Sequence, residues 1–147
     1  MADQKKIKIL LVDDDEMIRI YLTEIFWVHG LEAKYEIDDV NTPEKAEELI
    51  NNPETRPRLI FLDLVMPTQK DGRIESTPEA GLNLLKKIKS NPELQNIKVV
   101  IFSGFTQGDF KNQALELGAE AFLEKGENLS QDILNCVEKY APVTPSQ

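Results

Sequence analysis

The chain has 147 residues, of which 41% are hydrophobic and 29% charged, as in an ordinary soluble globular protein with one domain and a substantial core. Its formal net charge of -9 argues against direct DNA binding and against a membrane-surface patch. A single cysteine excludes an intramolecular disulfide and a zinc cluster, and no apolar run reaches the length of a signal peptide or a membrane span, so we expect a cytoplasmic protein.

The chain begins with a strand pattern followed by a helix pattern. Residues 7–12 are an apolar run typical of a strand buried on both faces. A helical pattern follows and ends at Gly30, with Asp15 and Glu16 as acids at its N-terminus. We expect Trp27, in its last turn, to pack against the core.

The next elements lead to the centre of the chain. Residues 32–37 alternate in polarity and predict an edge strand. Thr42 and Pro43 are typical of a helix start. Residues 59–62 are again uniformly apolar and predict a central strand, which ends at Asp63. Because an ionised carboxylate is costly to bury, Asp63 should lie at the end of the sheet.

The second half repeats the same alternation. Thr77 begins another helix with a proline behind it. Residues 97–102 and 121–123 predict two further strands, and helices are expected near residues 107–117 and 129–140.

Together these patterns predict one domain at residues 6–141, with flexible tails at 1–5 and 142–147. Five strand–helix units joined by right-handed crossovers give an α/β fold, a three-layer doubly wound arrangement around a five-stranded parallel sheet. With the alternating strand at one edge, the sheet takes the flavodoxin-like order 2-1-3-4-5.

Four of the predicted strands end in polar side chains, namely Asp13 with its acidic neighbours, Asp63, Ser103 and Lys125. These strands are consecutive in the proposed sheet, so their ends meet at the edge where such sheets bind ligands. Crowded carboxylates raise one another's pKa unless a cation lies among them, and Mg²⁺ is the usual occupant. With the ammonium and hydroxyl groups, the site suits a phosphoryl group, which a carboxylate can accept as an acyl phosphate.

These motifs closely resemble the receiver domain of bacterial two-component response regulators, of the stand-alone kind known from chemotaxis. The resemblance covers about residues 6–140 and rests on four motifs: Val12-Asp13-Asp14, Asp63 with Met66-Pro67, Ser103-Gly104, and Lys125. It implies that Asp63 is the phosphoacceptor and that Mg²⁺ or Mn²⁺ is the cofactor. It further implies that Asp14 is the direct metal ligand, that Asp13 completes the acid pocket, and that the backbone carbonyl of Val65 faces the metal.

The resemblance also assigns the switching residues. It implies that Ser103 hydrogen-bonds the phosphoryl group, that Lys125 pairs with a phosphoryl oxygen, and that Phe122 is the aromatic that turns inward as Ser103 shifts. Val65 and Phe105 lie two positions beyond Asp63 and Ser103, where receiver side chains flank the path of the hydrolytic water. Both are apolar, so we hypothesise that the acyl phosphate is comparatively long-lived.

The chain departs from the family pattern in two further places. The glycine that usually follows Met-Pro closely is matched only by Gly81, so residues 68–79 form an inserted loop. This loop is either a tolerated surface insertion or a partner-selecting element, with Lys70 and Arg73 able to touch a phosphorylated donor. Gly126 replaces the usual proline after Lys125, and glycine does not enforce one backbone conformation.

The resemblance implies a signalling switch rather than an enzyme, although one that assists its own phosphorylation and dephosphorylation. A sensor histidine kinase or a His-phosphotransfer protein would donate the phosphoryl group. Output would pass to a downstream protein, since no output domain follows, and a weak homodimer is compatible with the family. One alternative is a degenerate receiver that acts only as an interaction module.

A remote alternative is a haloacid-dehalogenase-type phosphohydrolase, for which Asp13 and Asp15 supply an Asp-x-Asp motif. That family expects Thr or Val where this chain has Met17, and Asp63 would have no role.

Overall fold

The computed structural model describes residues 5–104, 109–126 and 129–143, with residues 68–70 and 129 described by their backbone alone. The predicted tails lie largely outside these ranges. The elements are, in chain order, β1 (Ile7–Val12), α1 (Glu16–Val28), the 3-10 helix η1 (Leu31–Ala33), β2 (Tyr35–Val40), α2 (Pro43–Asn51), β3 (Leu59–Leu62), β4 (Met66–Lys70), β5 (Arg73–Thr77), α3 (Pro78–Ser90), β6 (Lys98–Ser103), α4 (Phe110–Glu116), β7 (Ala121–Glu124) and α5 (Leu129–Tyr140). Among the described residues, no helix combines the length and the apolar character needed to cross a membrane.

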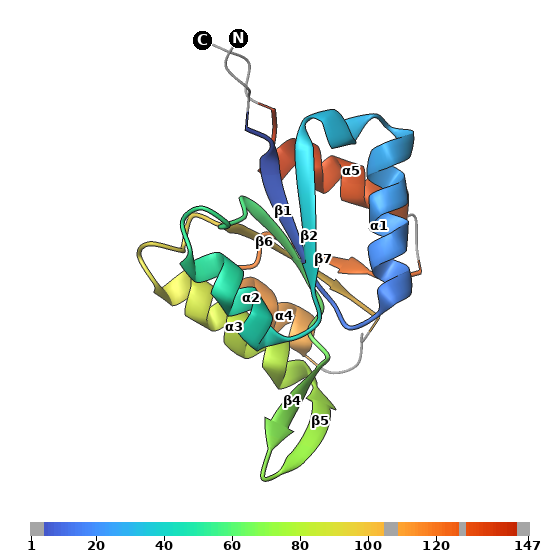
Figure 1. The fold of residues 1–147 in the computed structure, drawn as a ribbon. Coiled ribbons are helices and arrows are strands. Elements are labelled where there is room, and N and C mark those ends of the chain that lie inside the picture. The colour runs from blue at the N-terminus through green and yellow to red at the C-terminus, as the bar shows by residue number, and fades with distance from the viewer. Residues whose placement is uncertain (1–4, 105–108, 127–128, 144–147) are drawn as a thin grey trace.

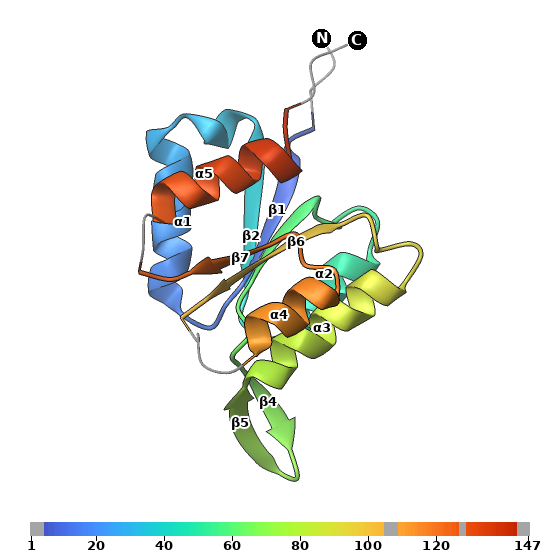
Figure 2. The ribbon, with the colours of Figure 1, turned by 180° about the vertical axis from the view of Figure 1, so that it is seen from behind.

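Five strands form one parallel sheet in the order β2-β1-β3-β6-β7. Helices α1 and α5 lie on one face of the sheet, and α2, α3 and α4 lie on the other (Figures 1 and 2). The predicted three-layer doubly wound fold is therefore confirmed, with β6 and β7 as the fourth and fifth strands of the flavodoxin-like order.

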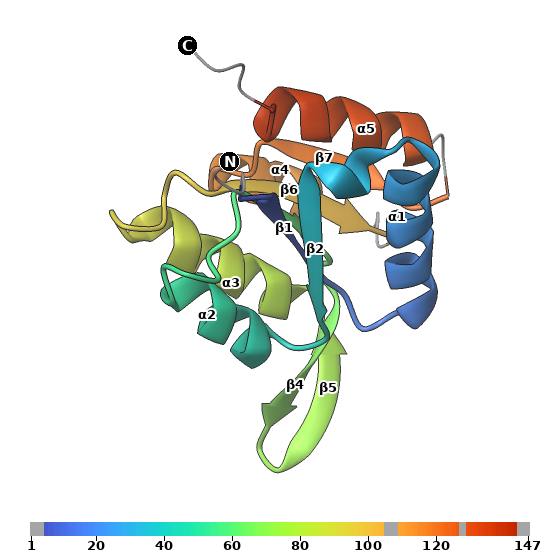
Figure 3. The same ribbon diagram turned by 45° about the horizontal axis from the view of Figure 1, so that its top comes forward.

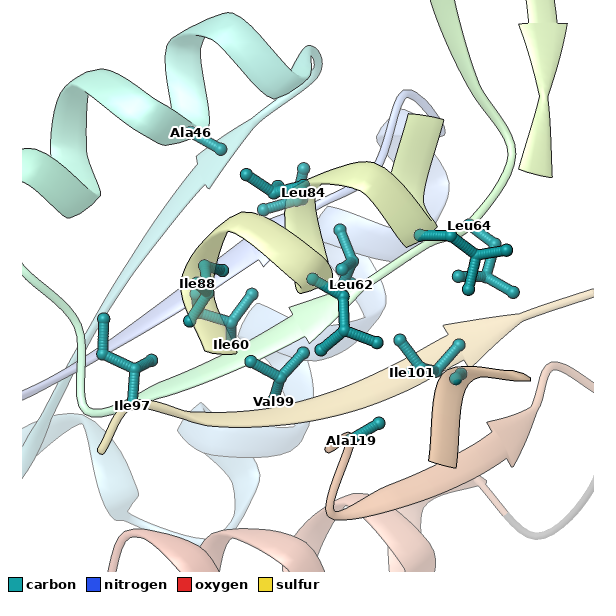
Figure 4. Packing of buried hydrophobic residues seen from close by; sticks show 14 of the residues in the cluster. Ala46, Ile60, Leu62, Leu64, Leu84, Ile88, Ile97, Val99, Ile101 and Ala119 are labelled. Carbon is teal, nitrogen blue, oxygen red and sulfur yellow. The ribbon is translucent and has the colours of Figure 1, made fainter. Parts of the chain in front are cut away.

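Strand β3 is buried on both faces, as its uninterrupted apolar sequence predicts. Side chains alternate across a strand, so Ile60 and Leu62 pack with α2, α3 and α4 (Figure 4), while Leu59 and Phe61 pack with α1 and α5. Burying each such side chain contributes about 1.5–3 kcal/mol relative to leaving it exposed. These two cores hold the sheet, and therefore its strand ends, from both sides.

Helix α1 begins and ends as the sequence indicates. Asp15 caps it by accepting a hydrogen bond from a backbone N–H of the first turn, and Gly30 follows its end with a left-handed φ of 67°. The expectation for Trp27 was wrong, because its side chain is 67% exposed. One residue step turns a helix by about 100°, which carries Trp27 away from the buried face formed by Leu22, Ile25 and Phe26.

Strand β2 is an edge strand as predicted, but it starts later. The residues directly after Gly30 form η1, and β2 pairs with β1 from Tyr35 to Val40. The expected strand at 32–37 was therefore wrong at its beginning, because the left-handed glycine leads into a tight turn rather than an extended segment.

The segment predicted as a loop at 68–79 forms a β-hairpin instead. Strands β4 and β5 pair antiparallel from Met66↔Thr77 to Lys70↔Arg73. Asp71 and Gly72 make the two-residue turn with positive φ values of 53° and 76°, which is the backbone geometry that suits the twist of a hairpin. The hairpin projects from the body of the molecule (Figures 1 and 3), and α3 begins directly after it. That this segment is an insertion relative to the family stays a prediction.

Candidate functional site

Four strand ends converge at the carboxyl edge of the sheet. Asp13 follows β1 and Asp63 follows β3, while Ser103 is the last residue of β6. Lys125 follows β7, and its backbone N–H donates to the Ser103 carbonyl at 3.0 Å. The backbone N–H of Asp63 donates to the Val12 carbonyl at 2.9 Å. The parallel ladder thus continues past the strands and fixes the backbone from which the polar side chains project.

The side chains from three of these ends meet. Lys125 Nζ lies 2.6 Å from Asp13 Oδ2 and 3.3 Å from Asp63 Oδ2. Both carboxylates are buried, with 7% and 6% of their residue surfaces exposed. The ammonium also lies 5.7 Å from the centre of the Phe102 ring, which can stabilise a cation. One lysine therefore bridges two buried carboxylates that are far apart in sequence.

Backbone groups orient both carboxylates. Asp13 Oδ1 accepts a hydrogen bond from Asp15 N at 2.9 Å, and Asp63 Oδ1 accepts one from Val65 N at 3.3 Å. Asp13 Oδ2 makes no hydrogen bond of regular geometry within the described chain and is balanced only by its ion pair with Lys125. The acid pocket is therefore held in place but incompletely satisfied.

The pKa values of the pocket carboxylates reflect mainly their burial. Burial raises the pKa of Asp63 to about 6, with a further contribution from Asp13 and against the effect of Lys125. Burial also raises the pKa of Asp13 above its ordinary value. Burial lowers the pKa of Lys125, but its close contact with the Asp13 carboxylate and the charge of Asp63 outweigh burial, so the pKa is raised overall. The lysine therefore stays charged.

The donor set fits a hard divalent cation. One carboxylate oxygen from each of Asp13, Asp14 and Asp63 can be chosen so that all three lie within 4.8 Å of one another, and Asp14 is exposed at the rim. Three carboxylates facing one ammonium leave a net negative charge, and their oxygens are the ligands that Mg²⁺ and Mn²⁺ prefer. These residues could therefore hold such an ion.

Gly81 allows α3 to approach the segment after Asp63. Its backbone N–H donates to the Leu64 carbonyl at 3.0 Å. A Cβ at this position would lie 2.5 Å from Leu64 Cα and 2.8 Å from the Asp63 carbonyl oxygen, so only glycine fits without displacement. Sequence reasoning noted Gly81 but not this contact, which appears only once α3 is packed on the end of β3.

Comparison with known proteins decides the family. Residues 9–137 match the response regulator receiver domain. The chain belongs to this family. It is 30% identical over 136 residues to the sporulation initiation phosphotransferase F of Bacillus subtilis, covering 92% of this chain and 94% of that protein. It is 31% identical to the response regulator VraR of Staphylococcus saprophyticus, but covers only 56% of that longer protein.

Solved structures agree with the receiver fold. The phosphorylated cyanobacterial phytochrome response regulator RcpA superposes with a TM-score of 0.76 at 25% identity, covering 96% of this chain and 98% of that one. The Mn²⁺-bound form of the response regulator Rcp1 superposes with a TM-score of 0.72 at 25% identity, over 95% and 96% of the two chains.

The remaining receiver residues are placed as follows. The Ser103 residue is fully buried at the sheet edge, next to Lys125 in the backbone ladder. Phe122 is partly buried and packs against the core on the side of α2, α3 and α4. Gly126 adopts a left-handed φ of 102°, which its lack of a side chain permits. Phe105 lies outside the described residues, and so does the side chain of Lys70.

Proposed function

We propose that this receiver takes a phosphoryl group from a phosphohistidine donor onto Asp63, with Mg²⁺ as cofactor. The observation that carries the proposal is the constellation around Asp63. Its carboxylate faces the Lys125 ammonium at 3.3 Å and lies within metal-sharing distance of Asp13 and Asp14. The sporulation initiation phosphotransferase, by its name, transfers a phosphoryl group, and it resembles this chain over nearly its full length.

The proposed transfer is a displacement at phosphorus. An oxygen of the Asp63 carboxylate forms the new P–O bond while the P–N bond of phosphohistidine breaks. The electron pair of that bond remains on the imidazole nitrogen, which takes up a proton from solvent. A pKa of about 6 leaves Asp63 mostly ionised at neutral pH, as a nucleophile must be. Lys125 is placed to pair with a phosphoryl oxygen, which stabilises the transferring group.

The metal would add to this stabilisation. Asp13, Asp14 and Asp63 would hold Mg²⁺ or Mn²⁺, with the Val65 carbonyl as a further proposed ligand. When bound, the ion supplies positive charge to the phosphoryl oxygens. The receiver thus assists its own phosphorylation and dephosphorylation while acting as a switch.

The switch is proposed to run through Ser103 and Phe122. Phosphoryl on Asp63 would draw in the Ser103 hydroxyl, and Phe122 would repack into the space that this movement opens. The surface of α4, β7 and α5 would then change for a downstream protein or for a second copy in a weak homodimer. Onward transfer in a relay is the other output. The proposed location is the cytoplasm, where kinases have access to ATP.

The side chains of Val65 and Phe105 are apolar, so neither can orient a water molecule for attack. They support slow hydrolysis of the acyl phosphate in this proposal. The expected result is an acyl phosphate that outlasts a few seconds in purified protein with Mg²⁺. Following the loss of label from the phosphorylated chain measures this directly, and a lifetime of seconds would contradict it.

Phosphorylation by acetyl phosphate with Mg²⁺ tests the main proposal. Intact-protein mass spectrometry should show the addition of one phosphoryl group, and the Asp63→Asn variant should show none. Asp71→Asn, which makes the same change on an exposed carboxylate of the hairpin turn, serves as the matched control and should be phosphorylated normally.

Two other outcomes would point elsewhere. Failure of the unaltered chain to accept phosphoryl would favour the degenerate receiver. Turnover of a phosphate ester that is lost in Asp13→Asn but kept in Asp63→Asn would favour the phosphohydrolase, against which the use of Asp15 as the cap of α1 already argues.

A further inference from the structure

The β4–β5 hairpin is built as a projecting arm. Its five cross-strand pairs close on a tight Asp71–Gly72 turn. At about 3.4 Å per residue, five residues reach roughly 17 Å. The two strands form a sheet of their own, separate from the five-stranded sheet.

Both ends of the arm are anchored next to the phosphoacceptor. Met66, the first residue of β4, lies three positions after Asp63 and is fully buried in the core. Thr77, the last residue of β5, passes directly into α3. That helix is itself packed against the residues after Asp63 through Gly81. The arm therefore has a fixed base at the rim of the acid pocket.

The arm projects beside the edge of the sheet that a protein donor must approach. It projects from the edge of the sheet where β1, β3 and β6 end, beyond the bodies of the helices (Figures 1 and 3). Asp63 is only 6% exposed. A protein that carries a phosphoryl group must therefore bring its surface over this edge, next to the arm, to reach the carboxylate.

The outer part of the arm carries an exposed apolar side chain. Residues 71–76 are all exposed, and Ile74 is 73% exposed, more than any other large hydrophobic residue of the described chain. Ile74 lies opposite Gln69 in the hairpin. A partner protein that covered this side chain would gain the free energy of burying its apolar surface.

We propose that the β4–β5 hairpin is a docking arm for the protein that donates the phosphoryl group, with Ile74 as its apolar contact. This inference rests on the proposed function, because it assumes that Asp63 is phosphorylated by a protein. Contact with the arm would hold the donor over the pocket and raise the rate of transfer without taking part in the chemistry.

Comparing a protein donor with a small donor tests this proposal. The small donor is phosphoramidate, which has the same P–N bond as phosphohistidine. The protein donor is chosen from a panel of radiolabelled, autophosphorylated histidine kinases. It is the kinase that transfers its phosphoryl group fastest to the unaltered chain. A shortened arm is made by deleting Gln69, Lys70, Arg73 and Ile74, which joins Thr68 to Asp71 and Gly72 to Glu75. Because two complete pairs are removed, the turn is kept and each remaining side chain stays on the same face of the hairpin.

The shortened arm should slow transfer from the kinase by about tenfold or more, as expected for loss of an interface anchor, and leave the phosphoramidate rate within about twofold. Ile74→Ser should give a smaller loss of the same kind. Val28→Ser is the matched control, because Val28 is 67% exposed and is the last residue of α1, at the end away from the acid pocket. This variant should change neither rate.

Several results would overturn the docking arm. The first is an equal loss of transfer rate with both donors, which indicates a damaged pocket. The second is no loss of rate with either donor, and the third is an equal effect of Ile74→Ser and Val28→Ser. Loss of self-association or of binding to a downstream target, with kinase transfer unchanged, would assign the arm to those partners instead. If the unaltered chain accepts phosphoryl from neither donor, the proposed function itself fails.

Discussion

Two lysine–carboxylate clusters with largely buried side chains lie at opposite ends of β6, and they differ in how fully their charges are matched. Near the start of β6, Lys89 Nζ lies 2.9 Å from Glu120 Oε1 and donates to the Ile97 carbonyl at 2.7 Å. The second oxygen of Glu120 accepts from Val99 N at 2.6 Å. Both side chains are largely buried, one charge faces one charge, and backbone groups take up the remaining bonds.

At the other end of β6, the same chemistry is left unbalanced. Lys125 faces Asp13 and Asp63 together, and Asp14 adds a third carboxylate at the rim. The pKa values of Asp13 and Asp63 are raised, mainly by burial. The matched pair links α3 to the start of β6 and to the residue before β7, whereas an excess of carboxylates leaves a net negative charge that can bind a cation. We propose that this contrast separates an ion pair that stabilises the fold from the carboxylates of the proposed phosphorylation site.

The largest expected effect is loss of the matched pair. Glu120→Gln should lower the free energy of unfolding by about 3 kcal/mol, because the largely buried ammonium of Lys89 loses its counter-charge. Urea denaturation measures the change, and phosphorylation of the folded variant by acetyl phosphate should be unaltered. Glu116→Gln, an exposed change on α4, is the control. A loss of phosphorylation with unchanged stability would reverse the roles assigned to the two clusters.

For the acid pocket, we expect a change in the free energy of unfolding of the opposite sign. Asp63→Asn should raise the free energy of unfolding at pH 7.5 without metal, because it removes a carboxylate that burial disfavours. We expect about 1–2 kcal/mol, within the roughly 3 kcal/mol that corresponds to a pKa difference of about two units. Urea denaturation of both proteins in a chelator measures this. Destabilisation by Asp63→Asn would show that the pocket is as well matched as the other cluster.

The pH dependence of that difference follows from linkage. The folded-state pKa of about 6 lies above the ordinary value of 3.8, so the folded state holds the proton more tightly. The advantage of Asp63→Asn should therefore be absent below about pH 4, grow up to about pH 6 and be complete above it. Parallel denaturation series across this range test the sign, and an advantage that shrinks as pH rises would contradict it.

Metal binding should act on one cluster alone. Mg²⁺ at ten times its dissociation constant should raise the free energy of unfolding by about 1.4 kcal/mol, and a chelator should remove the gain. The gain should disappear in Asp14→Asn, which loses a proposed ligand, and persist in Glu120→Gln. Thermal denaturation with and without Mg²⁺ measures both. An undiminished gain in Asp14→Asn would remove that residue from the site.

The smallest effect is expected for an exposed pair, which gives a baseline for both clusters. Lys8 and Glu36 pair across β1 and β2 with both side chains partly in solvent. Glu36→Gln should change the free energy of unfolding by no more than about 0.5 kcal/mol, as is usual for surface ion pairs. Denaturation at low and high salt measures it. A larger value would mean that burial is not what distinguishes the three pairs.

The fold and the pocket were predictable because strand ends and polar residues coincide in the sequence. Asp63 and Ser103 each stand where an apolar run stops, and sheet order then brings those ends together. Predicting that Lys125 contacts Asp13 required the strand order 2-1-3-4-5 of the sheet. The edge-strand pattern at Tyr35 and Ile37 had indicated this order.

Other features depend on contacts that no local pattern carries. The close approach of Gly81 to Leu64 depends on how α3 packs, which the sequence does not report. The hairpin did have a signal, since Asp71-Gly72 is a favoured hairpin turn, but its strands lack the alternating apolar residues that normally accompany it. Phe122 is partly buried against the core, and the inward rotation predicted for it concerns a second state of the molecule and stays a prediction.

The exposure of Trp27 has a practical consequence for fluorescence measurements of signalling. It is the single tryptophan of the chain, and it sits in water at the end of α1 farthest from the acid pocket. Its emission will be that of a hydrated indole whether or not the pocket is occupied. An optical readout of the switch therefore calls for an indole moved inward, for example by combining Trp27→Phe with Phe122→Trp.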